Sequence, residues 1–534
     1  MTQASPALPA PILRGLECAR ESPGCELDGE PTYDEARKRW IVTLWLQLDN
    51  AGPSVDARTK WRVLFDPEYP LGRISFYPSV DHGLTGTFPH QERNVAPRDA
   101  TGWRTGKLCL DSPFRGERLC TDARDPVGDE EARLQWYVRR ALQWLKAAAE
   151  GTLLATGDPF EIPAVPSTGK KEWRARLVVH DESPRTVPSW TSRLAEAGHA
   201  TFGTVSGLEN AIGVVAFTDR HNSPVRTWGG RPLESRPDGP SGYWWLWPGP
   251  IVLPPWHAPG TWGELRVAGA ASGIHVDRML KRFAPILRGS KHDHLLLLGY
   301  PIPTRVGSAP NEVHWNTLLL PRLPSETGKP PPGFRPNAIG WWKRDRRDSF
   351  ADDTQLEYVD TENWSSDRLQ ARGRFPEPVR GARIAIIGLG ALGSAVAELL
   401  ARGGASSLAL FDPELLASGN ICRHTLTLAS VGRTKVRAVA ARLREVSPFV
   451  SVTEFEKGLF GDARQVTDAL DPFDVVIDCS GSDVVLALLE SGWWSIPRVF
   501  ASFSMGYRGK RLFSFSVRSN RFPRACTTST TTPR

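Results

Sequence analysis

The chain has 534 residues, which exceeds the size of one ordinary domain and predicts about three or four domains. Hydrophobic residues make up 40% of the sequence and charged residues 23%, so the chain can bury substantial cores and is not disordered as a whole. The net charge of +7 is small for this length, and no basic run with interleaved aromatic residues indicates nucleic acid binding.

The sequence predicts neither a membrane span nor a secretory signal. The most apolar stretch, 384–401, is interrupted by three glycines and by Glu398, and so does not read as a transmembrane helix. The first residues contain neither a basic nor an apolar segment of the kind found in a signal peptide, so we expect a cytoplasmic protein. The seven cysteines show no Cys-x-x-Cys spacing, which disfavours a zinc ribbon and predicts free thiols.

The predicted fold class is multidomain, with an α+β region followed by α/β regions. In the first region, 1–165, alternating β-branched residues predict strands at 40–49, 60–65 and 73–77. The turn-rich segment between the last two strands predicts an antiparallel meander. Apolar residues at helical spacing then predict a long amphipathic helix from about residue 129 to residue 150.

The middle region, 166–345, is rich in Trp, Pro and Gly and contains no catalytic constellation. Its patterns predict a helix near 276–287 and strands at 175–180, 213–217 and 294–298. The segment 346–380 begins with a dense run of charges, which predicts a linker or a surface segment.

The last region, 381–534, alternates strands with helices. The predicted strands are 383–387, 407–411, 450–455, 474–477 and 498–502, and the predicted helices are 391–402, 432–446 and 462–470. Such alternation predicts a parallel, doubly wound sheet of the Rossmann type.

A glycine-rich motif lies between the first strand and the first helix of this region. Gly388, Gly390 and Gly393 are spaced as in loops whose backbone N–H groups approach phosphates at the start of a helix. Asp412 ends the next strand, where an acidic residue accepts hydrogen bonds from ribose hydroxyls. The combination predicts a nucleotide site.

Three polar residues further along the chain indicate which nucleotide binds. Asn420 and Arg423 follow Asp412, and Lys435 stands at the start of the following helix. Two cations that converge on a phosphate site suit a triphosphate whose leaving group must be neutralised. The alternative interpretation is that Arg423 and Lys435 are solvated surface charges.

Together these residues resemble the ubiquitin-activating, ThiF and MoeB adenylyltransferase superfamily, over about residues 380–505. The resemblance implies that Asp412 binds the ribose, that Asn420, Arg423 and Lys435 surround the phosphates, and that ATP with Mg²⁺ is the co-substrate. The implied reaction is attack of a carboxylate on the α-phosphate of ATP, which gives an acyl adenylate and pyrophosphate.

The metal-binding segment departs from the family pattern. Where the family has Asp-Cys-Thr-Asp-Asn, this chain has Asp478-Cys-Ser-Gly481-Ser-Asp483. Gly481 occupies the position of the aspartate that helps to hold Mg²⁺. The ligand is therefore Asp478, Asp483 or another group.

A second motif surrounds Cys109. The segment Gly106-Lys-Leu-Cys-Leu-Asp, preceded by His90 and Asn94, resembles the active-site region of ubiquitin-conjugating enzymes over roughly residues 30–150. The resemblance implies that Cys109 carries a thioester, with His90 and Asn94 in the catalytic segment. A cysteine in a polar loop can stay accessible and partly ionised, as a carrier thiol must. The alternative is a buried, inert cysteine.

The order of the two motifs, thiol first and adenylation last, resembles fused enzymes of the CBASS antiphage systems. That family implies a degenerate adenylation fold in the middle region, a homodimer, and a protein substrate with a free C-terminus, either a cGAS-like nucleotidyltransferase or a ubiquitin-like protein, which becomes joined to target lysines. Activating enzymes of this type also use their own late cysteine. Cys526, in a Thr-rich tail, is the one late cysteine here, and we expect a truncated or frameshifted end.

Two other functions stay open. The first is a ThiF-like activator of a small sulfur-carrier protein, which leaves residues 30–150 unexplained. The second is a non-catalytic scaffold that binds a partner, which Gly481 and the Thr-rich end favour.

Overall fold

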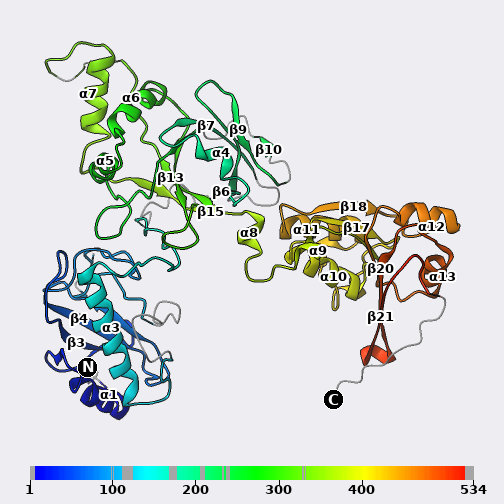
Figure 1. Cartoon of the computed structure of the whole chain (residues 1–534), viewed down its shortest axis with the longest axis horizontal. Coiled ribbons are helices and arrows are strands. Elements are labelled where there is room, and N and C mark those ends of the chain that lie inside the picture. The colour runs from blue at the N-terminus through cyan, green and yellow to red at the C-terminus, as the bar shows by residue number, and fades with distance from the viewer. Residues whose placement is uncertain are drawn as a thin grey trace. The chain divides into compact units, whose positions relative to one another are not determined.

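The computed structural model describes residues 6–97, 99, 101–110, 124–166, 177–204, 211–230, 234–235, 241–327, 330 and 332–523. The chain forms two compact units, which are coloured by residue number in Figure 1. The first unit comprises Met1–Ala175, Pro184–His199 and Pro240–Asp360, and the second comprises Arg176–Ser183, Ala200–Gly239 and Thr361–Arg534. None of the described helices combines the length and the apolarity needed to cross a membrane.

The N-terminal part of the first unit is an antiparallel sheet covered by two helices, α1 (Ala10–Arg20) and α3 (Ala132–Glu150). The predicted meander and the predicted long helix are confirmed. Leu134, Val138 and Leu145 of α3 are fully buried against the sheet, which explains the apolar spacing of the helix. The strands are β1 (Cys25–Leu27), β2 (Thr32–Asp34), β3 (Arg39–Gln47), β4 (Arg58–Phe65) and β5 (Ile74–Pro78).

The second part of this unit is a mixed sheet with its own apolar core. Strand β12 pairs in parallel with β11 and antiparallel with β13, and β14 pairs with β13. Helix α6 has the predicted bounds. The elements are α4 (Pro188–Thr191), β11 (Ser241–Leu246), α5 (Trp262–Ala271), α6 (Val276–Leu287), β12 (His294–Ile302), β13 (Glu312–Leu319), α7 (Ala338–Asp348) and β14 (Glu357–Val359).

The second unit begins with paired strands, in which β8 pairs with β6 and β9, and β15 pairs with β6. Its strands are β6 (Leu177–His180), the larger part of β7 (Ala197–Thr204), β8 (Ala211–Thr218), β9 (Pro224–Thr227), β10 (Glu234–Ser235) and β15 (Thr361–Asn363). Two short helices follow, α8 (Ser366–Leu369) and α9 (Glu377–Arg380).

Part of the segment 346–380, for which the sequence predicts a linker or a surface segment, forms strands: β14 and β15 supply backbone hydrogen bonds to sheets. The charge run that suggested a solvated segment is partly internal. Asp345 is buried, and its carboxylate accepts hydrogen bonds from Arg288 and Arg344. Paired charges of this kind are compatible with a folded interior.

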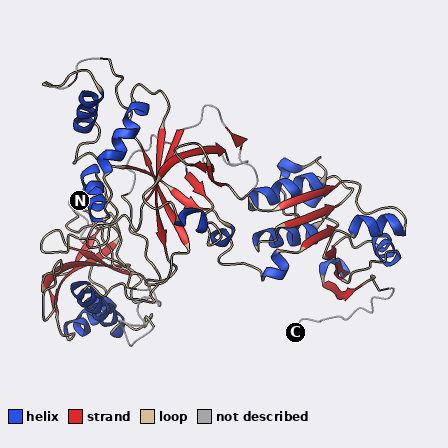
Figure 2. Ribbon diagram, turned by 45° about the horizontal axis from the view of Figure 1, so that its top comes forward, coloured by secondary structure: helices blue, strands red, loops and turns tan. Residues whose placement is uncertain are grey.

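The remainder of the second unit is the predicted doubly wound sheet. Its strand order is β18-β17-β16-β19-β20-β21, and the first five strands are parallel. Residues of α10 and α11 pack in the core on one face, and residues of α12 and α13 pack in the core on the other (Figure 2). The bounds are β16 (Arg383–Ile387), α10 (Ala391–Arg402), β17 (Ser407–Phe411), α11 (Lys435–Val446), β18 (Ser451–Phe455), α12 (Ala463–Leu470), β19 (Val475–Asp478), α13 (Asp483–Ser491), β20 (Arg498–Gly506) and β21 (Arg511–Ser519).

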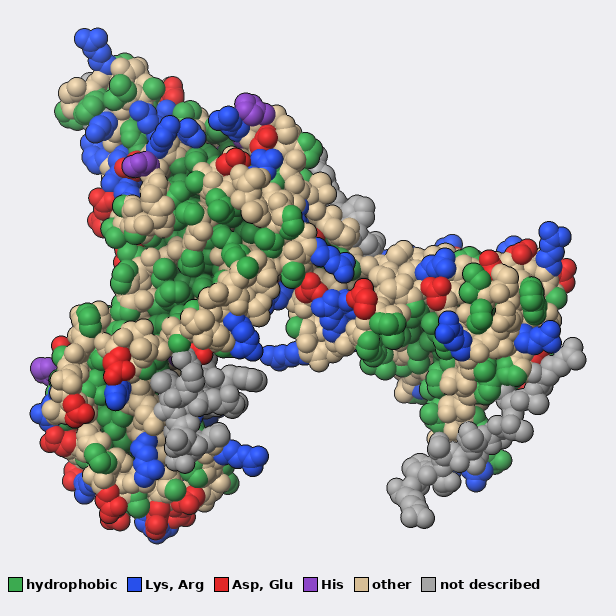
Figure 3. All heavy atoms as spheres, viewed as in Figure 1, with side chains coloured by type: hydrophobic (Ala, Val, Ile, Leu, Met, Phe, Trp, Pro, Cys, Tyr) green, Lys and Arg blue, Asp and Glu red, His purple; other side chains and the backbone are tan. Residues whose placement is uncertain are grey.

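The sequence patterns do not predict two elements of this region. Helix α13 directly follows Gly481, and the antiparallel strand β21 forms a hairpin with a β20 that is longer than predicted. On the face shown in Figure 3, acidic and basic side chains of the described residues are interspersed over the N-terminal part.

Candidate nucleotide and thiol sites

The glycine loop is tightly packed on one side and open on the other. Gly388 has φ +83°, and a Cβ there would lie 2.6 Å from Ser480 Cα. A Cβ at Gly393 would collide with the Gly388 carbonyl. Gly390 is the N-cap of α10 and has nothing within 4 Å of the Cβ position, so space remains at the start of the helix. The loop therefore has the shape expected of a phosphate-binding turn.

Asp412 is buried at the carboxyl end of β17 and holds two loops. One carboxylate oxygen accepts the Leu389 N–H at 2.6 Å, and the other accepts the Glu414 N–H at 2.8 Å. A carboxylate has about four lone-pair positions, so two remain for a ligand. Asp412 can thus shape the glycine loop and still accept hydrogen bonds from hydroxyl groups.

Lys435 is buried at the first position of α11, and its ammonium forms an ion pair with Glu414. The Lys435 backbone N–H also donates to the Glu414 carbonyl at 3.0 Å. Glu414 is 69% exposed, whereas the lysine side chain is 5% exposed. The structure therefore fixes the lysine beside the segment that follows Asp412.

Asn420 and Arg423 lie in the segment that follows, which contains the short helix η1 (Ser418–Asn420). The Asn420 side-chain oxygen accepts the Ala417 N–H at 2.9 Å. Arg423 is exposed and donates to the Gly419 carbonyl at 3.2 Å. Its guanidinium is therefore held at the surface of this segment.

His424 directly follows Arg423, and no sequence motif assigns it a role. In the structure its Nε2 lies 2.7 Å from the Leu389 carbonyl oxygen, and its Nδ1 accepts the Leu426 N–H at 3.2 Å. Burial lowers the pKa of His424. This contact joins the Asn-x-x-Arg segment to the glycine loop.

The two predicted metal ligands differ in position. Asp478 is buried at the end of β19, opposite Ile387 in the sheet, and accepts hydrogen bonds from the Ser480 and Ser502 hydroxyls. Asp483 is exposed in the first turn of α13. No group of three potential metal ligands occurs among the described residues. Mg²⁺ is commonly held by one or two carboxylates together with substrate phosphates, so Asp478 beside the glycine loop fits this requirement.

Cys109 lies in a short paired segment of the first unit. Its N–H donates to the His90 carbonyl at 3.0 Å, and the neighbouring residues Gln91 and Leu108 form an antiparallel bridge. The residue is partly exposed and forms no disulfide. Cys109 therefore does not belong to the fully buried residues of the core.

The residues predicted beside the thiol are held by the surrounding chain. The Asn94 side-chain amide donates to the carbonyls of Leu84 and Gly86, and its oxygen accepts from Arg104. Because both amide hydrogens are bound within the loop, these contacts favour a structural role for Asn94 over an oxyanion role.

His90 is likewise enclosed. Its Nδ1 lies 2.5 Å from a Glu161 carboxylate oxygen, and its Nε2 lies 3.2 Å from the Leu153 carbonyl oxygen. Its backbone N–H also donates to Glu161 at 3.0 Å. His90 therefore anchors the segment that bonds the Cys109 backbone.

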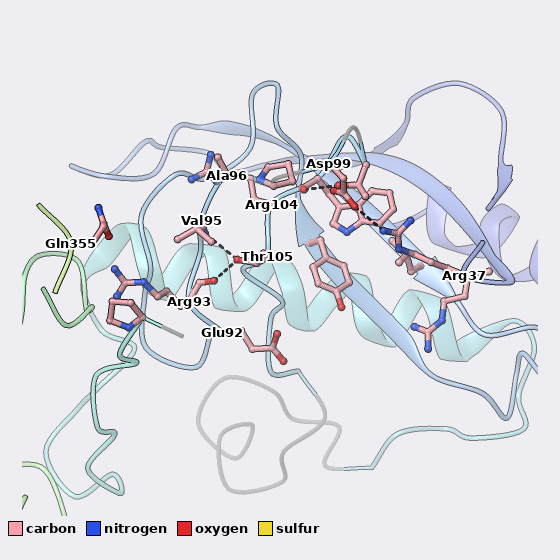
Figure 4. Close-up of a pocket in the computed structure, with 16 residues that line it drawn as sticks. Arg37, Glu92, Arg93, Val95, Ala96, Asp99, Arg104, Thr105 and Gln355 are labelled. Atoms are coloured by element: carbon pink, nitrogen blue, oxygen red, sulfur yellow. Dashed lines mark hydrogen bonds and ion pairs between the residues drawn. The ribbon is translucent and has the colours of Figure 1, made fainter. Parts of the chain in front are cut away.

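A cleft of about 1040 Å³ opens next to this segment. Figure 4 shows Arg37, Glu92, Arg93 and Arg104 around it. Glu92 pairs with Lys107 at 3.1 Å, two residues from Cys109. The thiol segment is thus bordered by an open, mixed-charge cleft.

The other described cysteines differ from one another in burial, and burial disfavours the thiolate form that reacts. Burial raises the pKa of Cys25 to about 11 and that of Cys479 to about 12, and the Asp478 charge adds to the effect at Cys479. Cys422 is exposed. Cys526, the predicted late cysteine, lies outside the described residues.

Comparisons with known proteins agree with the order of these regions. The family described as Cap2 central linker domain matches residues 151–364, and the ThiF family matches residues 370–484. Molybdopterin-synthase adenylyltransferase of Escherichia coli K12 is 32% identical over 117 residues, which are 22% of this chain and 46% of that protein. The crystal structure of E. coli MccB with AMPCPP and MccA is 17% identical, with a TM-score of 0.23, and the similarity covers 26% of this chain and 40% of that chain.

The parallel sheet, the glycine loop and Asp412 at a strand end, together with the ThiF match, define a Rossmann-like adenylation domain of the ThiF class. The ATP-dependent ubiquitin transferase-like protein Cap2 of Enterobacter hormaechei subsp. hoffmannii is 31% identical over 495 residues, which are 91% of this chain and 81% of that protein. The chain belongs to the Cap2 family.

Proposed function

We propose that the chain uses ATP to activate the C-terminal carboxylate of a partner protein. The observation that carries the proposal is the convergence of the open glycine loop, Asp412 and Lys435 at the carboxyl ends of β16 and β17, within the segment that matches the ThiF family. Ligands of open α/β sheets bind at this edge. The similarity to a molybdopterin-synthase adenylyltransferase and to a Cap2 protein supports the same reaction class.

In this proposal the backbone N–H groups of the glycine loop bind the triphosphate, and Asp412 accepts the ribose hydroxyls. Lys435 and Arg423 neutralise the pyrophosphate as it leaves, and Asn420 orients the phosphates. A carboxylate oxygen of the partner forms a bond to the α-phosphorus, and the bond from that phosphorus to pyrophosphate breaks. Catalysis of this kind depends on positioning and charge stabilisation. Bound Mg²⁺, with Asp478 as its protein ligand and Asp483 as the alternative, would add positive charge at the phosphates.

We further propose that Cys109 receives the activated acyl group. Its thiolate would attack the acyl carbon, release AMP and form a thioester, from which a lysine amine of a target takes the acyl group. The partial exposure of Cys109, the cleft lined by Glu92 and Thr105, and the backbone hydrogen bond from Cys109 to His90 support this role. The first 165 residues would then be a ubiquitin-conjugating-like domain, and 166–345 a degenerate adenylation fold. A fused chain also raises the effective concentration of one site near the other.

Membership of the Cap2 family supports a proposal for the partner and the context. We propose a cytoplasmic homodimer of a CBASS antiphage system, whose partner is a cGAS-like nucleotidyltransferase. A ubiquitin-like protein is the alternative partner. Joining such a protein to target lysines would complete the transferase reaction.

The adenylation step is tested by exchange of radioactive pyrophosphate into ATP, with the full chain, Mg²⁺ and a candidate partner. We expect exchange with a free partner C-terminus and none with the same partner carrying a C-terminal amide. Equal exchange with both forms, or none with any candidate, would contradict the activation of a carboxylate.

The transfer step is tested by mass spectrometry of the chain after incubation with ATP and partner. We expect an adduct at Cys109 that a reducing thiol removes. The Cys109→Ser variant should form no such adduct and should retain pyrophosphate exchange, whereas Cys18→Ser should behave as the wild type.

A non-catalytic scaffold is the second candidate, and Gly481 at the position of the family's metal-holding aspartate favours it. It predicts stable binding of the partner with neither exchange nor adduct. A ThiF-like activator of a sulfur carrier predicts exchange without an adduct at Cys109.

A further inference from the structure

We infer that His424 is a positioning residue of the nucleotide site, which holds the second peptide group of the glycine loop in its binding orientation. The inference rests on the proposed ATP site and adds a residue to it. It starts from two hydrogen bonds, one at each nitrogen of the imidazole ring.

The two bonds fix the protonation state of the ring. The Leu426 N–H can only donate, so Nδ1 must carry a lone pair. The Leu389 carbonyl can only accept, so Nε2 must carry the hydrogen. His424 is therefore neutral, with its proton on Nε2. A second proton would have to occupy Nδ1 and would break the bond to Leu426.

The surroundings of the ring favour this neutral form. Burial lowers the pKa of His424, and the charges of Lys435 and Arg423 lower it further. The Asp412 carboxylate and the bond to the Leu389 carbonyl act in the opposite direction, but the net shift is downward. These four groups act on the imidazole, and they come from α11, the segment after η1, the end of β17 and the glycine loop.

Both backbone polar groups of Leu389 are bound by side chains. Its N–H is bound by Asp412 at 2.6 Å, and its carbonyl is bound by His424 at 2.7 Å. In a planar trans peptide the C=O and the following N–H point in opposite directions. The carbonyl of Leu389 shares its peptide plane with the N–H of Gly390. By fixing that carbonyl, His424 turns the Gly390 N–H away from itself.

Gly390 is the N-cap of α10, and the Cβ position there meets open space. An N–H aimed outward at a helix N-terminus is a donor for an anionic phosphate. If the peptide rotated, a carbonyl oxygen would face the phosphate and repel it. His424 thus acts on the nucleotide through the backbone, without touching it.

The test compares ATP binding to the full chain and to His424 variants by isothermal titration calorimetry at pH 7.5. We expect His424→Ala to weaken ATP binding about fivefold to tenfold, the effect of losing one net hydrogen bond. His424→Gln should bind within twofold of the wild type, because an amide can donate to Leu389 and accept from Leu426. Pyrophosphate exchange should show the same change in the KM for ATP, with kcat at saturating ATP altered less than twofold.

The pH dependence separates positioning from a merely structural role. Because the pKa of His424 lies below 6.5, the wild type should start to protonate Nδ1 only below pH 6.5. In titrations from pH 7.5 down to pH 4.5, wild-type affinity for ATP should therefore drop more than that of His424→Gln, which cannot take up this proton. Protonation of ATP itself affects both proteins equally, so the difference between them is the signal. Identical pH profiles, or a His424→Ala variant with unchanged affinity, would overturn the inference.

ATP binding by the wild type and by the variants separates an error in the role of His424 from an error in the proposed nucleotide site. If the wild type binds no ATP, the proposed nucleotide site is wrong. If the wild type binds ATP and all three proteins bind equally at every pH, the nucleotide site stands and His424 has no positioning role. Thermal unfolding of each variant shows whether a change in affinity reflects loss of the fold.

Discussion

The nucleotide site and the thiol site are built in different ways. At the nucleotide site, each predicted residue lies within one loop or helix start of the carboxyl ends of two parallel strands, and Asp412, Glu414 and Lys435 are already joined by hydrogen bonds and an ion pair. At the thiol site, Cys109 depends on a loop in which the side chains of Asn94 and His90 are committed to neighbouring backbone and carboxylate groups.

A sequence motif therefore predicts a site best when the topology of the fold itself brings the residues of the motif together. Parallel strands place their carboxyl ends at one edge, so a glycine loop and an acidic residue two elements apart must meet. For a cysteine in a loop, no such topological rule determines which residues lie beside it. Its reactivity depends on exposure and on neighbours that sequence spacing does not determine.

The largest expected effect concerns Lys435. Replacement by Met keeps most of the buried volume and removes the charge, and we expect pyrophosphate exchange to fall by about 10²–10³-fold. Arg437→Met, on the same helix but exposed and paired with Glu456, should leave exchange within about twofold. Equal loss in both variants would show that the lysine acts only through stability of α11.

Cysteine labelling at pH 8 compares the reactivity of the exposed and the buried thiols of the two sites. Because burial raises the pKa of Cys25 to about 11 and that of Cys479 to about 12, their thiolate fractions at pH 8 are about 10⁻³ and 10⁻⁴. We expect iodoacetamide to modify Cys109 and Cys422 first, as measured by peptide mapping. In guanidinium chloride all four should react alike. Early labelling of Cys479 in the native protein would contradict the packing of β19.

The next effect sharpens the interpretation of Asn94. Replacement by Ala leaves the carbonyls of Leu84 and Gly86 without their donor and should lower the free energy of unfolding by about 2–4 kcal/mol. Denaturant unfolding followed by tryptophan fluorescence measures this loss. Asn311→Ala, which removes a single exposed contact, should cost less than about 1 kcal/mol. Unchanged stability in Asn94→Ala together with lost transfer to Cys109 would instead favour an oxyanion role.

The smallest expected effect concerns Glu414. Its ion pair with Lys435 must be broken or shared when a phosphate binds the lysine. Glu414→Gln should therefore bind ATP more tightly than the wild type, by about twofold to threefold, as measured by calorimetry. Weaker binding would show that Glu414 is needed to hold the lysine in position.

The sequence predicts the ThiF-like sheet closely, since β16, β17 and α10 have the predicted bounds. Buried parallel strands are near-continuous apolar runs, and the helices between them carry a regular apolar face, so both can be predicted from the sequence. Strand β21 is missed although Phe513, Phe515 and Val517 alternate with polar residues, which is the pattern of a half-buried strand. Strand β14 is missed because its charged neighbours suggested a solvated segment. His424 is missed because its role lies in backbone hydrogen bonds, which residue type and spacing do not encode.

In the proposed reaction, a carboxylate attacks the α-phosphate of ATP in the site formed by Gly388, Asp412 and Lys435. A partner whose C-terminal carboxylate contains ¹⁸O tests it directly, by mass spectrometry of the nucleotide released after the acyl group is transferred. We expect AMP that contains one ¹⁸O atom from the partner, because the attacking oxygen stays on phosphorus when the acyl group is transferred. Release of ADP and phosphate, or of AMP without the label, would contradict it.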